Sequence, residues 1–175
     1  AGNDDTDANN ATYATVAGGY NNKANGPGSA IGGGDYNTAS GMDSAIGGGD
    51  GNTANGVGSA IGGGFINTAS GDESAIGGGD YNTASGDYSA IGGGYHNTAS
   101  GAESAIGGGG NNTASGVYSV IPGGYGNTAS GWYSFAAGNQ AHATTDGSFV
   151  WADAQDATYN DHGVNTFNVR AQNGA

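Results

Sequence analysis

One unit of sequence recurs along this chain at a constant step of fifteen residues. It reads Asn-Thr-Ala-Ser-Gly, two variable residues, Ser-Ala-Ile-Gly-Gly-Gly, and two more variable residues. An isoleucine falls in register in consecutive units, at Ile31, Ile46, Ile61, Ile76, Ile91, Ile106 and Ile121. Because so short a unit cannot bury its own apolar side chains, it must stack on copies of itself, and the repeat predicts a solenoid.

The unit is expected to form strands and turns rather than helix. Each of its three consecutive glycines would cost a helix about 1 kcal/mol. At about 3.3 Å per strand residue, the unit has room for two strands of about five residues joined by tight turns. The predicted fold class is therefore all-β, a parallel β-roll of about eight to nine two-strand coils spaced about 4.8 Å apart.

The two strands of a unit differ in their faces. In Thr38–Ser40 only Ala39 is apolar, which predicts a strand with Ala39 inside and hydroxyls outside. In the other strand Ile46 points to one face and Ala45 with Gly47 to the opposite one, and neither face is charged. A strand with two apolar faces is covered on both sides, and no other segment is long and apolar enough to do this. We therefore expect Ala45 and its copies to contact another copy of the chain in a ring-closing homo-oligomer.

Two invariant positions have structural interpretations. Asn37 and its copies are expected to stack from coil to coil as an amide ladder. Gly41 and its copies are expected where φ is positive or where backbones crowd.

Net charge excludes several partners. The formal charge is −13, and Lys23 and Arg170 are the only Lys and Arg residues. A chain without a basic patch does not neutralise phosphates, so we expect no nucleic-acid partner and no attraction to anionic lipid. No apolar run approaches the roughly 20 residues of a membrane span, and no basic-then-apolar leader opens the chain. We expect no membrane insertion by this segment, with any signal peptide or anchor lying elsewhere.

The variable pairs are expected at the two turns of each coil, where they would stack into two ridges along the roll. Exposed aromatic side chains on such ridges are well suited to contact a binding partner. The simpler interpretation is that turns merely tolerate them. The candidate ligand-contact residues are Tyr36, Phe65, Tyr81, Tyr88, Tyr95, Tyr118, Tyr125, Trp132 and Tyr133.

The repeat changes toward the C-terminus. Ser134 and Ser148 are fourteen residues apart, and bulky residues enter, as a capping coil requires. Residues 153–165 are predicted to form a loop, and 166–171 to form a closing strand with Phe167, Val169 and Ala171 pointing inward.

This gives three parts of the chain. Residues 1–10 are interpreted as a frayed lead-in, 11–152 as the β-roll, and 153–175 as the loop and terminal strand.

No catalytic or metal constellation is apparent. The three histidines are scattered, so we expect no enzyme and no cofactor. Three aspartates share one turn position and could hold a cation, but a solvated acidic ridge is the expected state, and no metal site is predicted. These histidines and aspartates are His96, His142, His162, Asp35, Asp50 and Asp80.

The segment Ser134–Ala143 reads Ser-x-Ala-x-Gly-x-x-Ala-x-Ala, and with the Asn-Thr-Ala-Ser-Gly and Ser-Ala-Ile-Gly-Gly-Gly array it resembles the YadA-like head repeat of trimeric autotransporter adhesins. The resemblance covers most of the chain. It implies a left-handed parallel β-roll, a homotrimer around one axis, and a head exposed at the bacterial cell surface, beyond the outer membrane, that binds host matrix or cell-surface ligands. The Asn-Ser-Val-Ala-Ile-Gly segment associated with collagen binding in one member of this family is absent.

Two other functions remain open. Similar repeats occur in phage tail fibres, so the chain could be a structural spacer or shaft. An ice-binding roll is the other alternative, because a regular hydroxyl array could order water. That array would consist of Thr38, Thr53, Thr68, Thr83, Thr98, Thr113 and Thr128, with a row of serines beside it.

Overall fold

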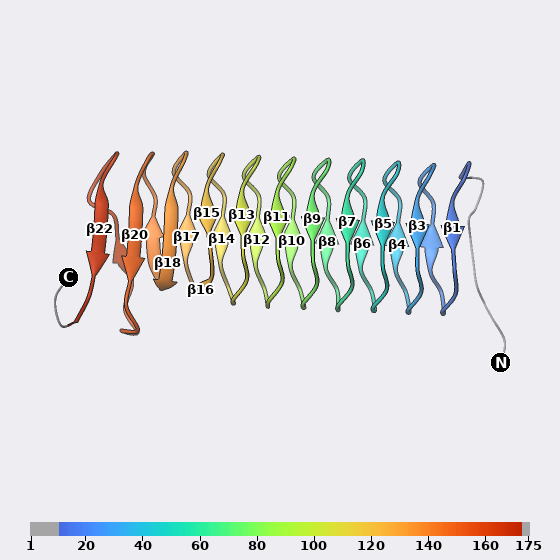
Figure 1. Ribbon diagram of the computed structural model, residues 1–175, viewed down its shortest axis with the longest axis horizontal. Coiled ribbons are helices and arrows are strands. Elements are labelled where there is room, and N and C mark those ends of the chain that lie inside the picture. The colour runs from blue at the N-terminus through green and yellow to red at the C-terminus, as the bar shows by residue number, and fades with distance from the viewer. Residues whose placement is uncertain (1–10, 173–175) are drawn as a thin grey trace.

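The computed structural model describes residues 11–172 as one straight stack of β-coils (Figure 1). Two parallel sheets run the length of the stack, of twelve and ten strands. The first sheet contains β1 (Thr15–Val16), β3 (Ala30–Ile31), β5 (Ala45–Ile46), β7 (Ala60–Ile61), β9 (Ala75–Ile76), β11 (Ala90–Ile91), β13 (Ala105–Ile106), β15 (Val120–Ile121), β16 (Gly124–Tyr125), β18 (Phe135–Asn139), β20 (Phe149–Ala152) and β22 (Phe167–Arg170). The second contains β2 (Lys23–Ala24), β4 (Thr38–Ala39), β6 (Thr53–Ala54), β8 (Thr68–Ala69), β10 (Thr83–Ala84), β12 (Thr98–Ala99), β14 (Thr113–Ala114), β17 (Thr128–Ala129), β19 (Ala141–Ala143) and β21 (Tyr159–Asn160).

The register confirms the predicted parallel solenoid. Ala45 pairs with Ala60 in the first sheet, and Thr38 pairs with Thr53 in the second, one repeat apart. The predicted strand length was wrong, because most strands have two residues rather than about five. The predicted number of coils was also low, because the ten strands of the second sheet make about ten coils. The additional coil comes from residues 153–165, for which the sequence predicts a loop and which contain β21.

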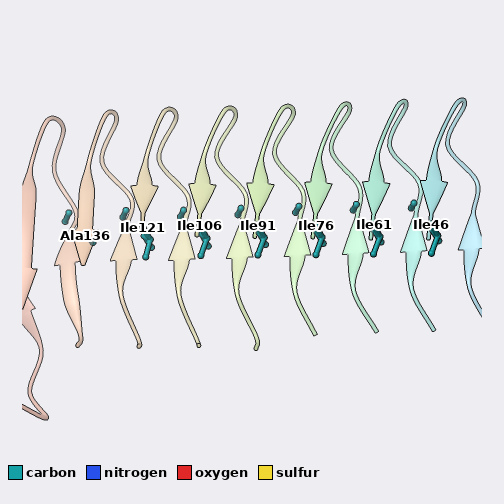
Figure 2. Close-up of a cluster of buried hydrophobic side chains, with 14 of the residues drawn as sticks. Ile46, Ile61, Ile76, Ile91, Ile106, Ile121 and Ala136 are labelled. Carbon is teal, nitrogen blue, oxygen red and sulfur yellow. The ribbon is translucent and has the colours of Figure 1, made fainter. Parts of the chain in front are cut away.

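The interior is a thin apolar core made of two facing columns. The isoleucines from Ile31 to Ile121 are at most 2% exposed, and Ala39 and its copies are fully buried. Figure 2 shows Ile46 to Ile121 in one row between the sheets, with Ala136 in the next place along the row. Burying each isoleucine contributes roughly 1.5–3 kcal/mol relative to exposure. The predicted inward positions of Ile46 and Ala39 are confirmed, and so is the outward position of Ala45.

The predicted asparagine ladder is confirmed, and its members are fully buried. In a representative rung, Asn82 Nδ2 donates to the carbonyl oxygens of Gly78 and Gly94, at 3.1 and 2.9 Å. It also lies 3.1 Å from Asn67 Oδ1, while Asn82 Oδ1 accepts from the Asn97 amide at 3.0 Å. One side chain therefore satisfies polar groups of three successive coils, and buried polar groups stabilise a fold only when they are satisfied in this way.

Glycine is required where coils approach each other closely. A Cβ atom added to Gly86 would collide with the carbonyl oxygen of Gly101 in the next coil. Gly86 is not among the residues with positive φ, so close approach is the reason for glycine here. In contrast, Gly94 has a φ of 96°, which L-residues with side chains rarely adopt.

A second buried polar column consists of serines, and its members are bonded differently. Ser44 Oγ donates to the Gly41 carbonyl oxygen at 2.8 Å. Eight equivalent hydroxyls have no partner among the residues that the structure describes, those of Ser29, Ser59, Ser74, Ser89, Ser104, Ser119, Ser134 and Ser148. The serine column therefore contributes far less hydrogen bonding than the asparagine ladder.

The C-terminal predictions need two corrections. The predicted loop 153–165 contains β21, which pairs with β19 and extends the second sheet. The predicted inward set of the last strand is also wrong, because Phe167 is 75% exposed while Asn168 is buried. Phe167 stacks on Phe149 outside the roll, with ring centroids 4.6 Å apart. Asn168 can point inward because its amide group bonds Thr166 Oγ1 at 2.8 Å and lies 2.7 Å from His162 Nδ1.

Two carboxylates tie the last coil to the stack. Arg170 Nε donates to Asp153 Oδ1 at 2.8 Å. Burial alone raises the pKa of Asp153, but hydrogen bonds from Gln155 and Arg170 outweigh it and lower that pKa below its ordinary value. Burial likewise raises the pKa of Asp161, and hydrogen bonds led by those from Thr145 lower it overall. Both carboxylates therefore serve the fold.

The two buried polar columns predict opposite mutational results. We expect Asn82→Ala to destabilise the roll strongly, because it leaves buried groups of neighbouring coils unpaired at roughly 1–3 kcal/mol each. Ser89→Ala in the next part of the coil is the matched control and is expected to change stability little. Urea unfolding followed by circular dichroism measures both. Equal losses for the two variants would contradict the role of the ladder.

Candidate functional site

The variable pairs form two ridges, one at each corner of the roll. The first ridge comprises Tyr20–Asn21, Asp35–Tyr36, Asp50–Gly51, Phe65–Ile66, Asp80–Tyr81, Tyr95–His96, Gly110–Asn111 and Tyr125–Gly126. The second ridge comprises Pro27–Gly28, Met42–Asp43, Val57–Gly58, Asp72–Glu73, Asp87–Tyr88, Ala102–Glu103, Val117–Tyr118, Trp132–Tyr133 and Asp146–Gly147. All nine candidate aromatic residues lie on these ridges and are exposed, from 37% for Phe65 to 64% for Tyr88 and Tyr133.

The corner backbone explains why these pairs are variable in sequence but constant in shape. In every one of these pairs the second residue has a positive φ, for example 51° at Ile66, 56° at Tyr81 and 67° at Gly51. Glycine adopts this conformation without strain, whereas for a residue with a Cβ atom the conformation costs about 1–2 kcal/mol in conformational energy. Several bulky side chains are thus kept at positions that glycine fills in other coils. Such strain is often found where a side chain has a function.

The first ridge brings four aromatic rings together. Phe65 meets Tyr81 edge to face, with centroids 5.3 Å apart. His96 stacks on Tyr81 at 4.9 Å, and Tyr95 meets His96 edge to face at 4.2 Å. Tyr36 contacts Tyr20 in a separate pair further toward the N-terminus. The first ridge is therefore divided into short aromatic groups and is not one continuous ladder.

The second ridge combines aromatic and acidic side chains. Tyr118 and Tyr133 stack with ring centroids 5.0 Å apart and ring planes 5° from parallel. Beside them, a hydrogen bond to Glu103 and the charge of that carboxylate raise the pKa of Tyr118 above its ordinary value of 10.0. Trp132, next to Tyr133, is 57% exposed.

A third surface is the outer face of the first sheet, which we define by the column of side chains that alternates with the buried isoleucines. It consists of Ala30, Ala45, Ala60, Ala75, Ala90, Ala105, Val120, Phe135, Phe149 and Phe167. None of these residues is charged, and the column beside it begins with glycines and ends in Trp151 and Val169. Thr15, which pairs with Ala30, places a hydroxyl at the N-terminal end of this column. From Ala30 onward the face is apolar, and it becomes bulkier toward the C-terminus.

Sequence reasoning missed the aromatic end of this face. Phe135, Phe149 and Phe167 stack at successive intervals of 4.6 Å. Beside them is a shallow hollow of about 300 Å³, lined by Gly138, Asn139, Trp151, Ala152, Asp153 and Ala154. The alternation of Phe149 and Trp151 with buried Val150 and Ala152 is the signal that would have identified these outward residues.

These surfaces present aromatic, aliphatic and carboxylate side chains to the outside. Among residues 11–172 no group of three or more Asp, Glu or His side chains is arranged to hold a metal ion. The same part of the chain has no helix that could cross a membrane.

Comparison with known proteins adds no assignment. The sequence matches no family model, and it matches no curated protein.

The strained corners predict a reciprocal pair of substitutions. Asn111 occupies the same corner position as Ile66, with φ of 54° and 51°. Asparagine tolerates this region better than a β-branched residue, so Ile66→Asn should stabilise the roll by about 1 kcal/mol. Asn111→Ile should destabilise it by a similar amount. Thermal unfolding of both variants checks this, and a loss of stability in both would show that packing of Ile66 outweighs the strain.

Proposed function

We propose that this chain is the head of a bacterial surface adhesin, assembled as a homotrimer of left-handed β-rolls, that binds host extracellular matrix or cell-surface ligands through its ridges. The observation that carries the proposal is the combination of an uncharged outer face with exposed aromatic ridges on one rigid roll. The resemblance of the repeat to YadA-like heads supports the trimer and the location at the cell surface, exposed beyond the outer membrane.

The outer face supports self-association. A contiguous apolar surface of this length is typical of an interaction site rather than of a free surface. Its side chains recur with the spacing of the coils, and a second copy of the chain has a surface with the same spacing. The neighbouring column includes Gly47 and Gly62, and a Cβ atom on Gly47 would collide with the Gly62 carbonyl oxygen of the next coil, so this column adds no side chains to the face. A ring of three copies would cover this face without leaving an open edge.

The ridges support ligand binding by many weak contacts. Tyr and Trp contribute large contact areas and a polar atom each, and are enriched at interfaces. Repetition along the roll, and across three copies, raises the overall affinity without any single strong site.

Two alternatives have support of their own. A spacer or tail-fibre shaft would use the same uniform stack with inert ridges. An ice-binding roll would use the second sheet, where threonines pair in register from Thr38 to Thr128. Thermal hysteresis in solution would favour ice binding over both other functions.

The oligomer is tested by its solution mass. One chain has a mass of 16.7 kDa, so light scattering on a sizing column should give about three times that value. Ala75→Glu with Ala90→Glu should yield monomers, because the substitutions place charges in the apolar contact. Thr83→Glu with Thr98→Glu, on the second sheet, is the matched control and should remain trimeric. A folded monomer for the unchanged chain would refute the assembly.

Ligand binding is tested on the ridges themselves. Replacing Tyr81, Tyr95, Tyr118 and Tyr133 by Ser should abolish binding to immobilised matrix proteins and to cultured host cells, because their contacts act together. The control variant replaces four threonines of the second sheet by Ser and should still bind. These threonines are Thr68, Thr83, Thr98 and Thr113. Undiminished binding of the tyrosine variant would exclude the ridges as the contact surface.

A further inference from the structure

The second ridge differs from the first in its charge. Its acidic residues are Asp43, Asp72, Glu73, Asp87, Glu103 and Asp146. The ridge contains no Lys or Arg. Of the two basic residues of the chain, Lys23 lies in β2 on the second sheet, and Arg170 bonds Asp153 in the last coil. Among the described residues, the ridge carboxylates therefore have no ion-pair partner within the chain.

Aromatic rings occupy the same ridge as these carboxylates. Tyr88 and Tyr133 are each 64% exposed, Trp132 is 57% exposed, and Tyr118 is 42% exposed. The stacked pair of Tyr118 and Tyr133 follows Glu103 along the ridge by one and two coils. The faces of aromatic rings attract cations, and this attraction adds to that of nearby carboxylates.

The backbone holds part of this surface in place. Asp72 Oδ1 accepts a hydrogen bond from the Val57 amide at 3.0 Å, and Asp87 Oδ1 accepts one from the Asp72 amide at 3.1 Å. Asp146 Oδ1 accepts one from the Trp132 amide at 2.8 Å. These carboxylates are thus positioned before any ligand arrives, which reduces the entropy lost on binding.

Charge decides which partner fits the ridge. A second copy of the chain would bring like charges together, and such juxtaposition is unfavourable. Nucleic acid and anionic lipid are repelled for the same reason. A basic polypeptide segment complements both features, because Lys and Arg side chains pair with carboxylates and also lie over aromatic rings.

We propose that the second ridge is the site that binds a basic segment of the partner protein, with Lys or Arg side chains over Tyr118, Trp132 and Tyr133 and against the neighbouring carboxylates. This inference rests on the proposed function in that it takes the ridges as the contact surface, and it names the ridge and the chemical class of partner.

The test compares two variants of equal charge. The first carries Asp72→Asn, Glu73→Gln, Asp87→Asn and Glu103→Gln, which remove four of the six negative charges of the second ridge and keep an oxygen for each backbone hydrogen bond. The control carries Asp35→Asn, Asp50→Asn, Asp80→Asn and Asp156→Asn, away from that ridge. The probe is a synthetic peptide of alternating Lys and Gly, and calorimetric titration measures its affinity for the intact head and for both variants.

We expect the second-ridge variant to lose about tenfold or more in affinity and the control to lose far less, since rim charges act mainly on their own patch. Tyr118→Ser with Tyr133→Ser should also lower the affinity for the peptide. Tyr118→Phe with Tyr133→Phe should retain that affinity. Equal losses in the two charge variants would show attraction to net charge alone and would overturn the inference, as would no loss in either.

A separate outcome distinguishes this inference from the proposed function. If the second-ridge variant still binds matrix proteins and host cells as well as the unchanged head does, the inference is wrong while the adhesin proposal stands. If the unchanged head binds no matrix protein or host cell but binds the peptide at this ridge, the adhesin proposal fails and the site remains.

Discussion

The stacking of one coil directly on the next is the constraint on which the rest of this structure depends. Backbone hydrogen bonds such as that from the Ala45 amide to the Ser59 carbonyl, at 2.9 Å, set the spacing between coils. That spacing leaves no room for a side chain where Gly86 faces Gly101. It also brings consecutive asparagines within hydrogen-bonding distance, so the ladder from Asn22 to Asn127 exists only because the coils are in register. Small residues and buried amides are thus two consequences of the same geometry.

Register converts each position of the repeat into a column, and the columns carry the surfaces of the molecule. The isoleucine column becomes the core, the alanine column on the other face of the same strand becomes the outer face, and the variable pairs become ridges. A solenoid this thin buries only one face of its first sheet. The apolar outer face and the proposed trimer are therefore linked to the small core. Each coil buries little apolar surface inside the roll, and association of copies would bury the apolar surface that remains outside.

The C-terminal coils show what happens when the repeat is relaxed. Ala141 replaces asparagine at the end of the ladder, and its amide bonds Asn127 Oδ1 at 2.9 Å. Beyond it, Arg170 donates to Asp153 and Asp161 accepts from the Thr145 amide, in place of the asparagine hydrogen bonds. The outer face changes at the same place from alanine to stacked phenylalanine rings. The end of the regular array is therefore also where the apolar surface is bulkiest.

The sequence by itself determined the solenoid, the parallel register, the inward isoleucine and alanine, and the asparagine ladder. These follow from a period that repeats with few errors, since each position meets its own copy in the next coil. It also placed the nine aromatic residues at turns, because variable pairs interrupt the strand pattern.

Only the tertiary structure decided the rest. Strand length depended on the positive φ of corner residues such as Tyr81 and Glu73, which end the extended backbone and which no composition rule identifies. Alternation in the last strand predicted Phe167 inside, but stacking on Phe149 and the hydrogen bonds of Asn168 reversed it. The grouping of aromatic rings on the first ridge and of carboxylates with rings on the second likewise depends on neighbours fifteen residues away, whose side-chain orientation a local pattern does not contain.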